Sequence, residues 1–288
     1  MGDPRVARHR APSVAGGGLD VTRALEVRGP ADAPALILLH GTRRTRGMWH
    51  HQLRDLADEY RVVAVDLPGH GALADVPFRL ADASALVGSI IEDAGHGRAI
   101  VIGQSLGAYV GMDLAASHPD RVAGLVLANA SAEPRSIARR APRTVGSYLL
   151  VAASEHLRGR GGHGPGNGPS EEGSGKADDT GDAGASSSAA TNGWLFKGGT
   201  RALVAALGEA FIPRLAAYPG PTLLINGEDD RLFRHGERAF LAAAANGRLE
   251  VIPGCGHLVN EDRPAAFNAA VRRFAAEVYG PEPRPGTP

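Results

Sequence analysis

Cysteine is almost absent from this sequence: Cys255 is the one cysteine among 288 residues. An intramolecular disulfide is therefore impossible, which favours a reducing compartment. The chain also lacks any apolar run approaching the roughly 18 residues that a membrane-spanning helix needs. Residues 1–10 carry positive charge without the apolar stretch of a secretory signal. We therefore expect a cytoplasmic protein with no membrane span.

An excess of either charge is lacking as well. Lys and Arg together number 31, as do Asp and Glu, so the formal net charge is zero. This balance gives no reason to expect a nucleic-acid partner. No Cys or His cluster has metal-ligand spacing, and no glycine-rich phosphate loop carries a lysine. We expect a small-molecule substrate and no cofactor or metal, and the sequence leaves the oligomeric state open.

Large apolar residues are missing from one internal stretch. Residues 158–192 contain no Leu, Ile, Val, Met, Phe, Tyr or Trp. Such a segment has too little apolar surface to offset the entropy of ordering it, so we predict that residues 158–193 are disordered. The segment lies within a long interval between two strand patterns, which we assign to an insertion over residues 131–217. We expect flexible tails at 1–18 and 281–288.

The rest of the sequence alternates strand and helix patterns. We expect strands near 20–28, 35–39, 61–65, 98–102, 122–128, 221–226 and 248–252, and helices near 47–59, 81–94, 106–117, 235–246 and 262–278. Such alternation predicts an α/β fold with a mostly parallel central sheet and helices on both faces. Its core would comprise residues 19–130 and 218–280.

Ser105 lies between two glycines in the run Gly103-Gln104-Ser105-Leu106-Gly107. A strand pattern precedes this run and a helix pattern follows it. A serine at such a direct turn adopts a cramped, usually positive φ, and glycine is needed where strand and helix nearly touch. The N-terminus of the helix also suits a developing oxyanion. We interpret Ser105 as a candidate nucleophile; the alternative is a serine that only caps the helix.

A serine nucleophile requires a base and a group that orients the base. Among 11 histidines, His257 follows a strand pattern in a glycine-bracketed loop, and open α/β sheets gather their sites at the carboxyl ends of strands. Asp229 and Asp230 follow another strand pattern, and neighbouring side chains diverge, so only one of them can face the histidine. We choose Asp230, with Asp229 as the alternative and Glu133 as a weaker one.

The order Ser105, Asp230, His257, each after a strand, resembles the α/β-hydrolase family. Two further segments carry the likeness: residues 36–42, which end in His-Gly-Thr, and residues 62–71, with the pattern Asp-x-x-Gly-x-Gly. The resemblance covers about residues 20–130 and 215–278. It implies a small helical cap in the insertion and selects Asp230 as the acid. It also places the two oxyanion-binding N–H groups on Thr42 and Leu106.

Residues that contact substrate are expected on two sides of this site. The family often continues its His-Gly loop with glycine, whereas this chain has Arg43, Arg44 and Arg46. Arginines there attract an anionic substrate; the alternative is an ordinary solvated loop. Candidate pocket residues from the insertion are Trp194, Phe196 and Phe211, for which ordinary cap core is the alternative.

The resemblance implies a serine hydrolase that cleaves a small ester, lactone or related acyl compound through an acyl-enzyme on Ser105. One alternative on the same framework is a carbon–carbon bond hydrolase of a vinylogous diketone acid. Another is a noncatalytic ligand-binding protein, because fold alone does not fix function.

Overall fold

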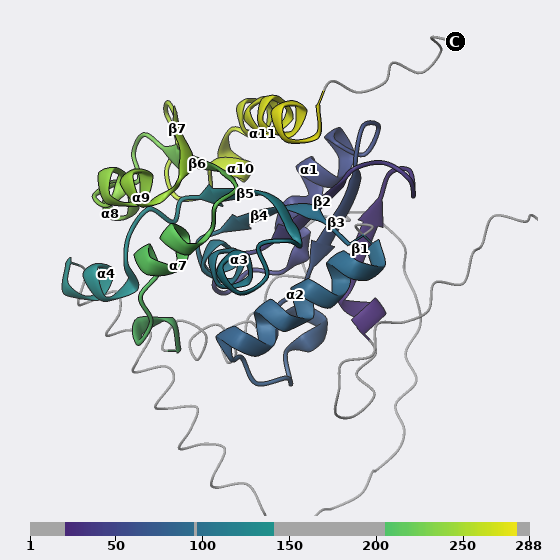
Figure 1. Cartoon of the computed structure of the whole chain (residues 1–288), viewed down its shortest axis with the longest axis horizontal. Helices are drawn as coiled ribbons and strands as arrows, with labels where there is room; N and C mark the ends of the chain where they lie inside the picture. Colours follow the sequence, from purple (N-terminus) through teal and green to yellow (C-terminus); the bar gives the residue numbers. More distant parts are fainter. Residues whose placement is uncertain (1–20, 95–96, 141–204, 281–288) are drawn as a thin grey trace, which may run out of the picture.

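The computed structural model describes residues 21–94, 97–140 and 205–280, and a sheet of seven strands forms its centre (Figure 1). The strands are β1 (Leu25–Arg28), β2 (Ala35–Leu39), β3 (Arg61–Val65), β4 (Ala99–Gln104), β5 (Val122–Ala128), β6 (Pro221–Gly227) and β7 (Asn246–Ile252). Their order is β1-β3-β2-β4-β5-β6-β7. β1 is antiparallel to β3 and the other neighbours are parallel, so the expected mostly parallel sheet is confirmed.

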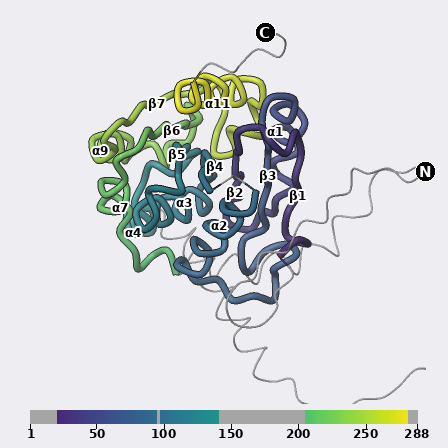
Figure 2. Tube along the Cα trace, turned by 45° about the vertical axis from the view of Figure 1, so that its right-hand side comes forward, coloured from purple at the N-terminus to yellow at the C-terminus, as the bar shows by residue number. Residues whose placement is uncertain are grey.

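Helices cover both faces of the sheet (Figures 1 and 2). One face packs against α2 (Leu80–Ala94), α3 (Leu106–Ser117), α7 (Ile212–Ala217) and α9 (Glu237–Ala243). The other packs against the 3₁₀ helix η2 (Arg46–Trp49), α1 (His50–Asp55), α10 (Val259–Asp262) and α11 (Pro264–Tyr279). Every residue of β2, β3, β4 and β5 is buried, which explains their continuous apolar sequences.

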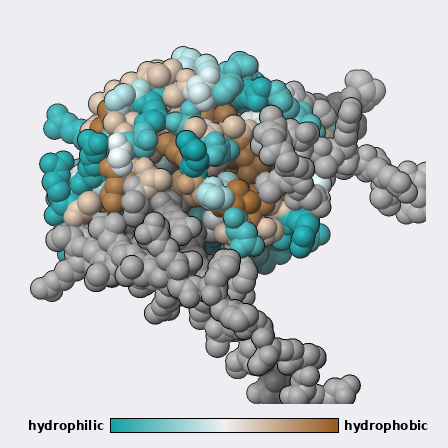
Figure 3. Space-filling model, turned by 90° about the horizontal axis from the view of Figure 1, so that it is seen from below, coloured by the Kyte–Doolittle hydropathy of each residue, from teal (hydrophilic) through white to brown (hydrophobic). Residues whose placement is uncertain are grey.

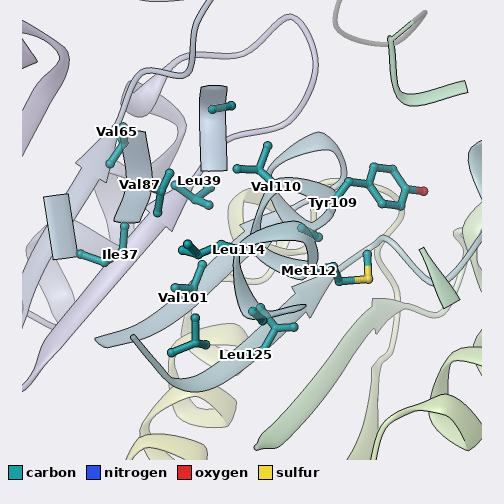
Figure 4. Packing of buried hydrophobic residues seen from close by; sticks show 14 of the residues in the cluster. Ile37, Leu39, Val65, Val87, Val101, Tyr109, Val110, Met112, Leu114 and Leu125 are labelled. Atoms are coloured by element: carbon teal, nitrogen blue, oxygen red, sulfur yellow. The ribbon is translucent and has the colours of Figure 1, made fainter. Parts of the chain in front are cut away.

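Two hydrophobic cores result, one on each face. Successive strand residues point to opposite faces, so Ile37 and Leu39 enter the core beneath α2 and α3, whereas Leu36 and Leu38 enter the core beneath α1 and α11. Figure 4 shows the first of these cores, with Val101 and Leu125 of the sheet among the buried side chains of this cluster. The turn that bears Ser105 therefore sits on a sheet that is packed from both sides.

The outer surface carries both polar and apolar residues. In Figure 3 hydrophobic residues gather near the middle of the face in view, with hydrophilic residues around them. Of the large hydrophobic side chains in the described ranges, Val27 is the one classed as exposed, at 41%. No helix within those ranges has the length and apolar character that crossing a membrane requires.

Three expected elements differ from the structure. The strand expected near 20–28 is wrong in its first half: residues 21–24 form the 3₁₀ helix η1 (Val21–Ala24), because its buried residues recur at a spacing of three instead of alternating. The helix expected near 47–59 ends at Asp55, where the carbonyl of Leu56 accepts turn hydrogen bonds from Glu59 and Tyr60.

The third difference lies after β6. Instead of one helix near 235–246, the chain forms the short α8 (Arg231–Arg234) followed by α9. Asp230 caps α8, since its Oδ1 accepts a 3.4 Å hydrogen bond from the N–H of Phe233. Aspartate is a favoured residue at the N-cap of a helix, so the sequence does contain a signal for a helix that begins at Arg231.

The described parts of the predicted insertion are its two flanks. After β5 the chain forms α4 (Pro134–Arg140), and residues 205–220, including α7, lead into β6. The predicted disordered segment 158–193, the tails, Trp194 and Phe196 lie outside the described residues. The insertion boundaries at 131 and 217 stay predictions.

The carboxyl ends of β2 and β4 lie very close to the start of α3. A Cβ built on Gly107 would lie 2.2 Å from the carbonyl oxygen of Leu39, and one on Gly103 would lie 2.3 Å from the backbone nitrogen of Ala108. Both contacts are with backbone, which cannot move aside as a flexible side chain does. Glycine at these two positions is therefore required by the close approach, as the spacing around Ser105 predicts.

We expect Gly107→Ala to lower the free energy of unfolding by about 3 kcal/mol, because the new methyl group overlaps the backbone of β2. Gly208→Ala is the matched control: its Cβ would meet nothing closer than 3.8 Å. Urea denaturation of both variants measures the difference. Equal stability of the two variants would contradict the close packing of α3 on the sheet.

Candidate active site

Ser105 forms the turn between β4 and α3. Its backbone has φ 49° and ψ −110°, one of three non-glycine positive φ values in the described chain. The N–H of Ser105 bonds to the carbonyl of Ala128 at 2.9 Å, and its own carbonyl accepts from Ala108 and Tyr109 in the first turn of α3. The residue is thus fixed from both sides while 9% of its surface remains exposed. This is the strained strand-to-helix turn expected for a nucleophile.

His257 and Asp230 are joined directly. The Nδ1 of His257 lies 2.7 Å from Oδ2 of Asp230. The aspartate side chain is 5% exposed and the imidazole 37%, so the carboxylate is shielded while the ring reaches the surface of a cavity. Since a carboxylate only accepts hydrogen bonds, Nδ1 carries the proton and Nε2 is free to act as a base.

Asn129 is a third member of this group that the sequence did not single out. Its Nδ2 donates to Oδ2 of Asp230 at 2.8 Å and to the carbonyl of Gly256 at 3.2 Å. The residue is fully buried and has φ 48°. Asparagine tolerates this left-handed conformation better than most residues. It therefore ties the loop after β6 to the loop that carries His257.

Two further side chains hold the histidine loop. The ring of Phe233 stacks on that of His257, with centroids 4.3 Å apart and planes inclined by 27°. Gln104 donates from Nε2 to the carbonyl of His257 at 2.8 Å. A Cβ on Gly41 would meet the same glutamine side chain at 2.0 Å, so Gln104 also packs on the loop after β2. Nothing in the sequence around Gln104 indicates that its side chain contacts both loops.

A cavity of about 290 Å³ brings the three candidate groups together. Its wall is formed by Thr42, Arg44, Gln104, Ser105, Leu106, Tyr109, Pro134, Ile137, Ala206, Leu207, Asp230, Leu232, Phe233, His257 and Leu258. Most of this wall is apolar, which suits a small organic substrate. No hydrogen bond joins Ser105 to His257 in the described structure, and such bonds often tighten only around substrate.

The two candidate oxyanion donors line the same cavity. Leu106 is the first residue of α3, so its N–H has no partner within the helix. Thr42 lies in the loop that follows β2 and also lines the cavity. Both residues therefore lie at the cavity wall, and their role as oxyanion donors stays a prediction.

His40 supports the loop that bears Thr42. Its Nε2 accepts from the N–H of Leu67 at 3.0 Å, and its Nδ1 lies 2.9 Å from the carbonyl of Gly41, to which it donates. Complete burial, with a smaller contribution from the positive charge of His70, lowers the pKa of His40 from 6.5 to about 3. The ring is therefore neutral in the folded protein, as the accepting Nε2 requires.

Several expected residues lie elsewhere. Asp229 is exposed, in contrast to Asp230, so the alternative acid does not face His257. Glu133 is not near the imidazole: its carboxylate accepts from the N–H groups of Phe211 and Ile212 at 2.7 to 3.0 Å, at the start of α7. Asp229 therefore belongs to a surface turn, and Glu133 binds the N–H groups at the start of a helix.

Two predicted substrate contacts, Phe211 and Arg43, are not among the residues that line the described cavity. Phe211 is fully buried and packs against the ring of Tyr109 at 4.4 Å, behind the wall instead of on it. Arg43 has φ 63° and lines an adjoining hollow of about 300 Å³, whereas Arg44 lines both this hollow and the cavity. Arg46 forms an ion pair with buried Asp66. Among the residues described, no group of three or more His, Cys, Asp or Glu is placed to hold a metal ion.

Comparison with known proteins assigns the family. A model described as the alpha/beta hydrolase family matches residues 36–270. The chain therefore belongs to the α/β-hydrolase family, in agreement with its sheet and with the strand-to-helix turn at Ser105.

Individual relatives cover the chain to different extents. The pimeloyl-(acyl-carrier protein) methyl ester esterase of Nitrosomonas europaea is 36% identical over 36% of this chain and 40% of that protein. The 2-(acetamidomethylene)succinate hydrolase of Mesorhizobium japonicum is 27% identical over 89% of this chain and 93% of that protein. A solved hydrolase from Pseudomonas aeruginosa is 26% identical, with TM-score 0.62 and coverage of 89% and 93%. The chain spans less than half the length of several curated relatives that it matches.

The buried neutral His40 predicts a pH dependence of stability. Because its pKa falls from 6.5 to about 3 on folding, the unfolded state binds more protons between these values. Stability is then fully present above pH 6.5 and declines as the pH falls, by about 1.4 kcal/mol per pH unit from this group. Urea denaturation from pH 7 to pH 4 measures the decline.

His40→Asn is expected to show a shallower decline than the wild type, whatever its stability at pH 7. His118→Asn, at an exposed histidine, is expected to keep the wild-type slope. An unchanged slope in His40→Asn would show that the buried ring does not control this dependence.

Proposed function

We propose that the protein is a serine hydrolase that cleaves a small ester, lactone or related acyl compound through an acyl-enzyme on Ser105. One arrangement carries the proposal: a serine at a strained turn shares a cavity with an imidazole whose Nδ1 lies 2.7 Å from a buried carboxylate. Relatives named as a methyl ester esterase and as an acetamidomethylene succinate hydrolase support hydrolysis of an acyl bond.

In the first step His257 acts as general base. Its Nε2 takes the proton of the Ser105 hydroxyl as Oγ attacks the carbonyl carbon of the substrate. Asp230 holds the Nδ1–H tautomer and stabilises the imidazolium that forms. Because Phe233 stacks on the imidazole, the ring of His257 is restrained from tilting out of its plane.

The attack places a negative charge on the former carbonyl oxygen. The N–H groups of Thr42 and Leu106 are the proposed donors to this oxyanion, and each donor contributes about 3 kcal/mol of transition-state stabilisation in comparable sites. The N-terminus of α3 adds positive potential at the same place.

Collapse of the tetrahedral intermediate breaks the bond to the leaving group, which takes the proton from His257. Water then attacks the acyl-enzyme as His257 removes its proton. The ester bond to Oγ breaks, the acid leaves, and His257 returns the proton to Ser105. The apolar wall of Leu106, Ile137, Leu207 and Leu232 favours a short hydrocarbon group on the substrate.

Ser105→Ala is expected to lower kcat for a nitrophenyl ester by about 10⁴-fold or more and to abolish labelling by a fluorophosphonate. Ser136→Ala is the control, because Oγ of Ser136 lies 2.6 Å from Nε2 of His235, a serine–histidine pair outside the cavity. Peptide mapping locates the label. An unlabelled wild-type protein would favour the noncatalytic alternative, and a dienone acid tested beside the ester separates acyl transfer from carbon–carbon cleavage.

Asp230→Asn is expected to lower kcat by about 10⁴-fold, because an amide favours the wrong imidazole tautomer. Asp229→Asn removes the same charge one residue away, on an exposed side chain, and is expected to retain wild-type turnover. Steady-state kinetics on the same ester compares the two. The assignment of the acid fails if both variants lose activity equally.

A further inference from the structure

Arg44 lies in the cavity wall beside the proposed oxyanion donors. Its N–H bonds to the carbonyl of Gly41 at 3.1 Å, and this turn brings the stretch from Thr42 to Arg44 to the cavity. The Cα atoms of Thr42 and Arg44 are separated by at most about 7 Å, the reach of two residues. Thr42 and Arg44 therefore belong to the same short stretch of the cavity wall.

The charges in the cavity are few. Among the described lining residues, Arg44 is the single lysine or arginine. The other ionised group is Asp230, which is engaged by His257 and Asn129. The remaining wall is largely apolar, with Leu232, Leu258 and Tyr109 among its members. A cation in such a setting is screened less than one at an open surface.

Glu261 holds the guanidinium in place. Nη2 of Arg44 lies 2.5 Å from Oε2 of Glu261, and the two side chains are 38% and 24% exposed. Glu261 does not line the cavity; it lines the adjoining hollow, whose wall Arg44 shares. A guanidinium has five N–H donors in a rigid fork, and this is its one side-chain hydrogen bond to the residues described. Because Arg44 also lines the cavity, its remaining donors are available to a second acceptor there.

We propose that Arg44 is a specificity-determining residue that binds a carboxylate of the substrate. The proposal rests on the proposed acyl hydrolysis at Ser105 and names its substrate class: a short acidic ester or lactone whose carboxylate lies a few bonds from the scissile carbonyl. The planar fork of arginine matches a carboxylate and binds it more strongly than a neutral acceptor. Glu261 fixes the fork but weakens the attraction, since its own charge repels a second anion.

The test measures protection of Ser105 from a neutral alkyl fluorophosphonate by two methyl ketones. 4-Oxopentanoate carries a carboxylate, and 5-methylhexan-2-one replaces it by an isopropyl group of similar shape. Neither is consumed by hydrolysis. For each variant, we measure the concentration of each ketone that halves the labelling rate of that variant. The value for the anion divided by the value for the neutral ketone is the anion-to-neutral ratio. We expect Arg44→Ala to raise this ratio about tenfold, the value of one lost hydrogen bond to a charged group. Arg44→Lys is expected to give an intermediate ratio.

Glu261→Gln is expected to change the ratio in the opposite direction, because Arg44 then lacks its counter-charge. Arg28→Ala, at an exposed arginine in β1, changes the net charge equally and is expected to keep the wild-type ratio. The inference is overturned if Arg44→Ala weakens both ketones alike, if its ratio stays at the wild-type value, or if the anion gives the wild type no protection. Loss of labelling in the wild type itself would instead refute the proposed function.

Discussion

The site depends on how closely the turn at Ser105 is held against the sheet. A non-glycine residue in an unfavourable backbone conformation costs on the order of 1–3 kcal/mol and persists only where its surroundings fix it. Here the surroundings are the buried β4 and α3, with glycines at 103 and 107 where a Cβ would overlap backbone. The packing of two hydrophobic cores thus sustains the strain, and the hydroxyl is positioned by the fold before any substrate arrives.

Backbone hydrogen bonds link the turn at Ser105 to the ends of the neighbouring strands. The N–H of Ser105 reaches the carbonyl of Ala128, and that of the next residue, Asn129, reaches β6 at Ile225, both at 2.9 Å. Beyond β6, Glu228 and Asp229 donate in the same way to Ile252 and Cys255. Four strand ends are therefore joined in one row, and side chains far apart in sequence share one edge. Because the row is made of backbone, side-chain changes in the cavity leave its spacing intact.

The sequence predicted the sheet well because its central strands are continuous apolar runs bounded by glycine or turns. It erred where a different period competed, as at Val21 and Ala24, whose spacing of three forms a 3₁₀ helix. The positions of Ser105, His257 and Asp230 followed from their place after strands. Asn129 and Gln104 were not identified, because their role depends on which loops meet in space. Arg43 and Phe211 lie outside the cavity lining for the same reason, since the orientation of a loop or helix depends on tertiary packing.

Part of the cavity wall and the three candidate catalytic side chains come from different kinds of segment, the former from long connections and the latter from turns at strand ends. Pro134 and Ile137 follow β5, and Ala206 and Leu207 precede β6, whereas Ser105, Asp230 and His257 belong to turns of the sheet itself. Surface connections tolerate replacement far better than the strands that they join. Proteins that share the strand ends can therefore differ in the substrates that they accept, because the connections can change while the turns of the sheet stay the same.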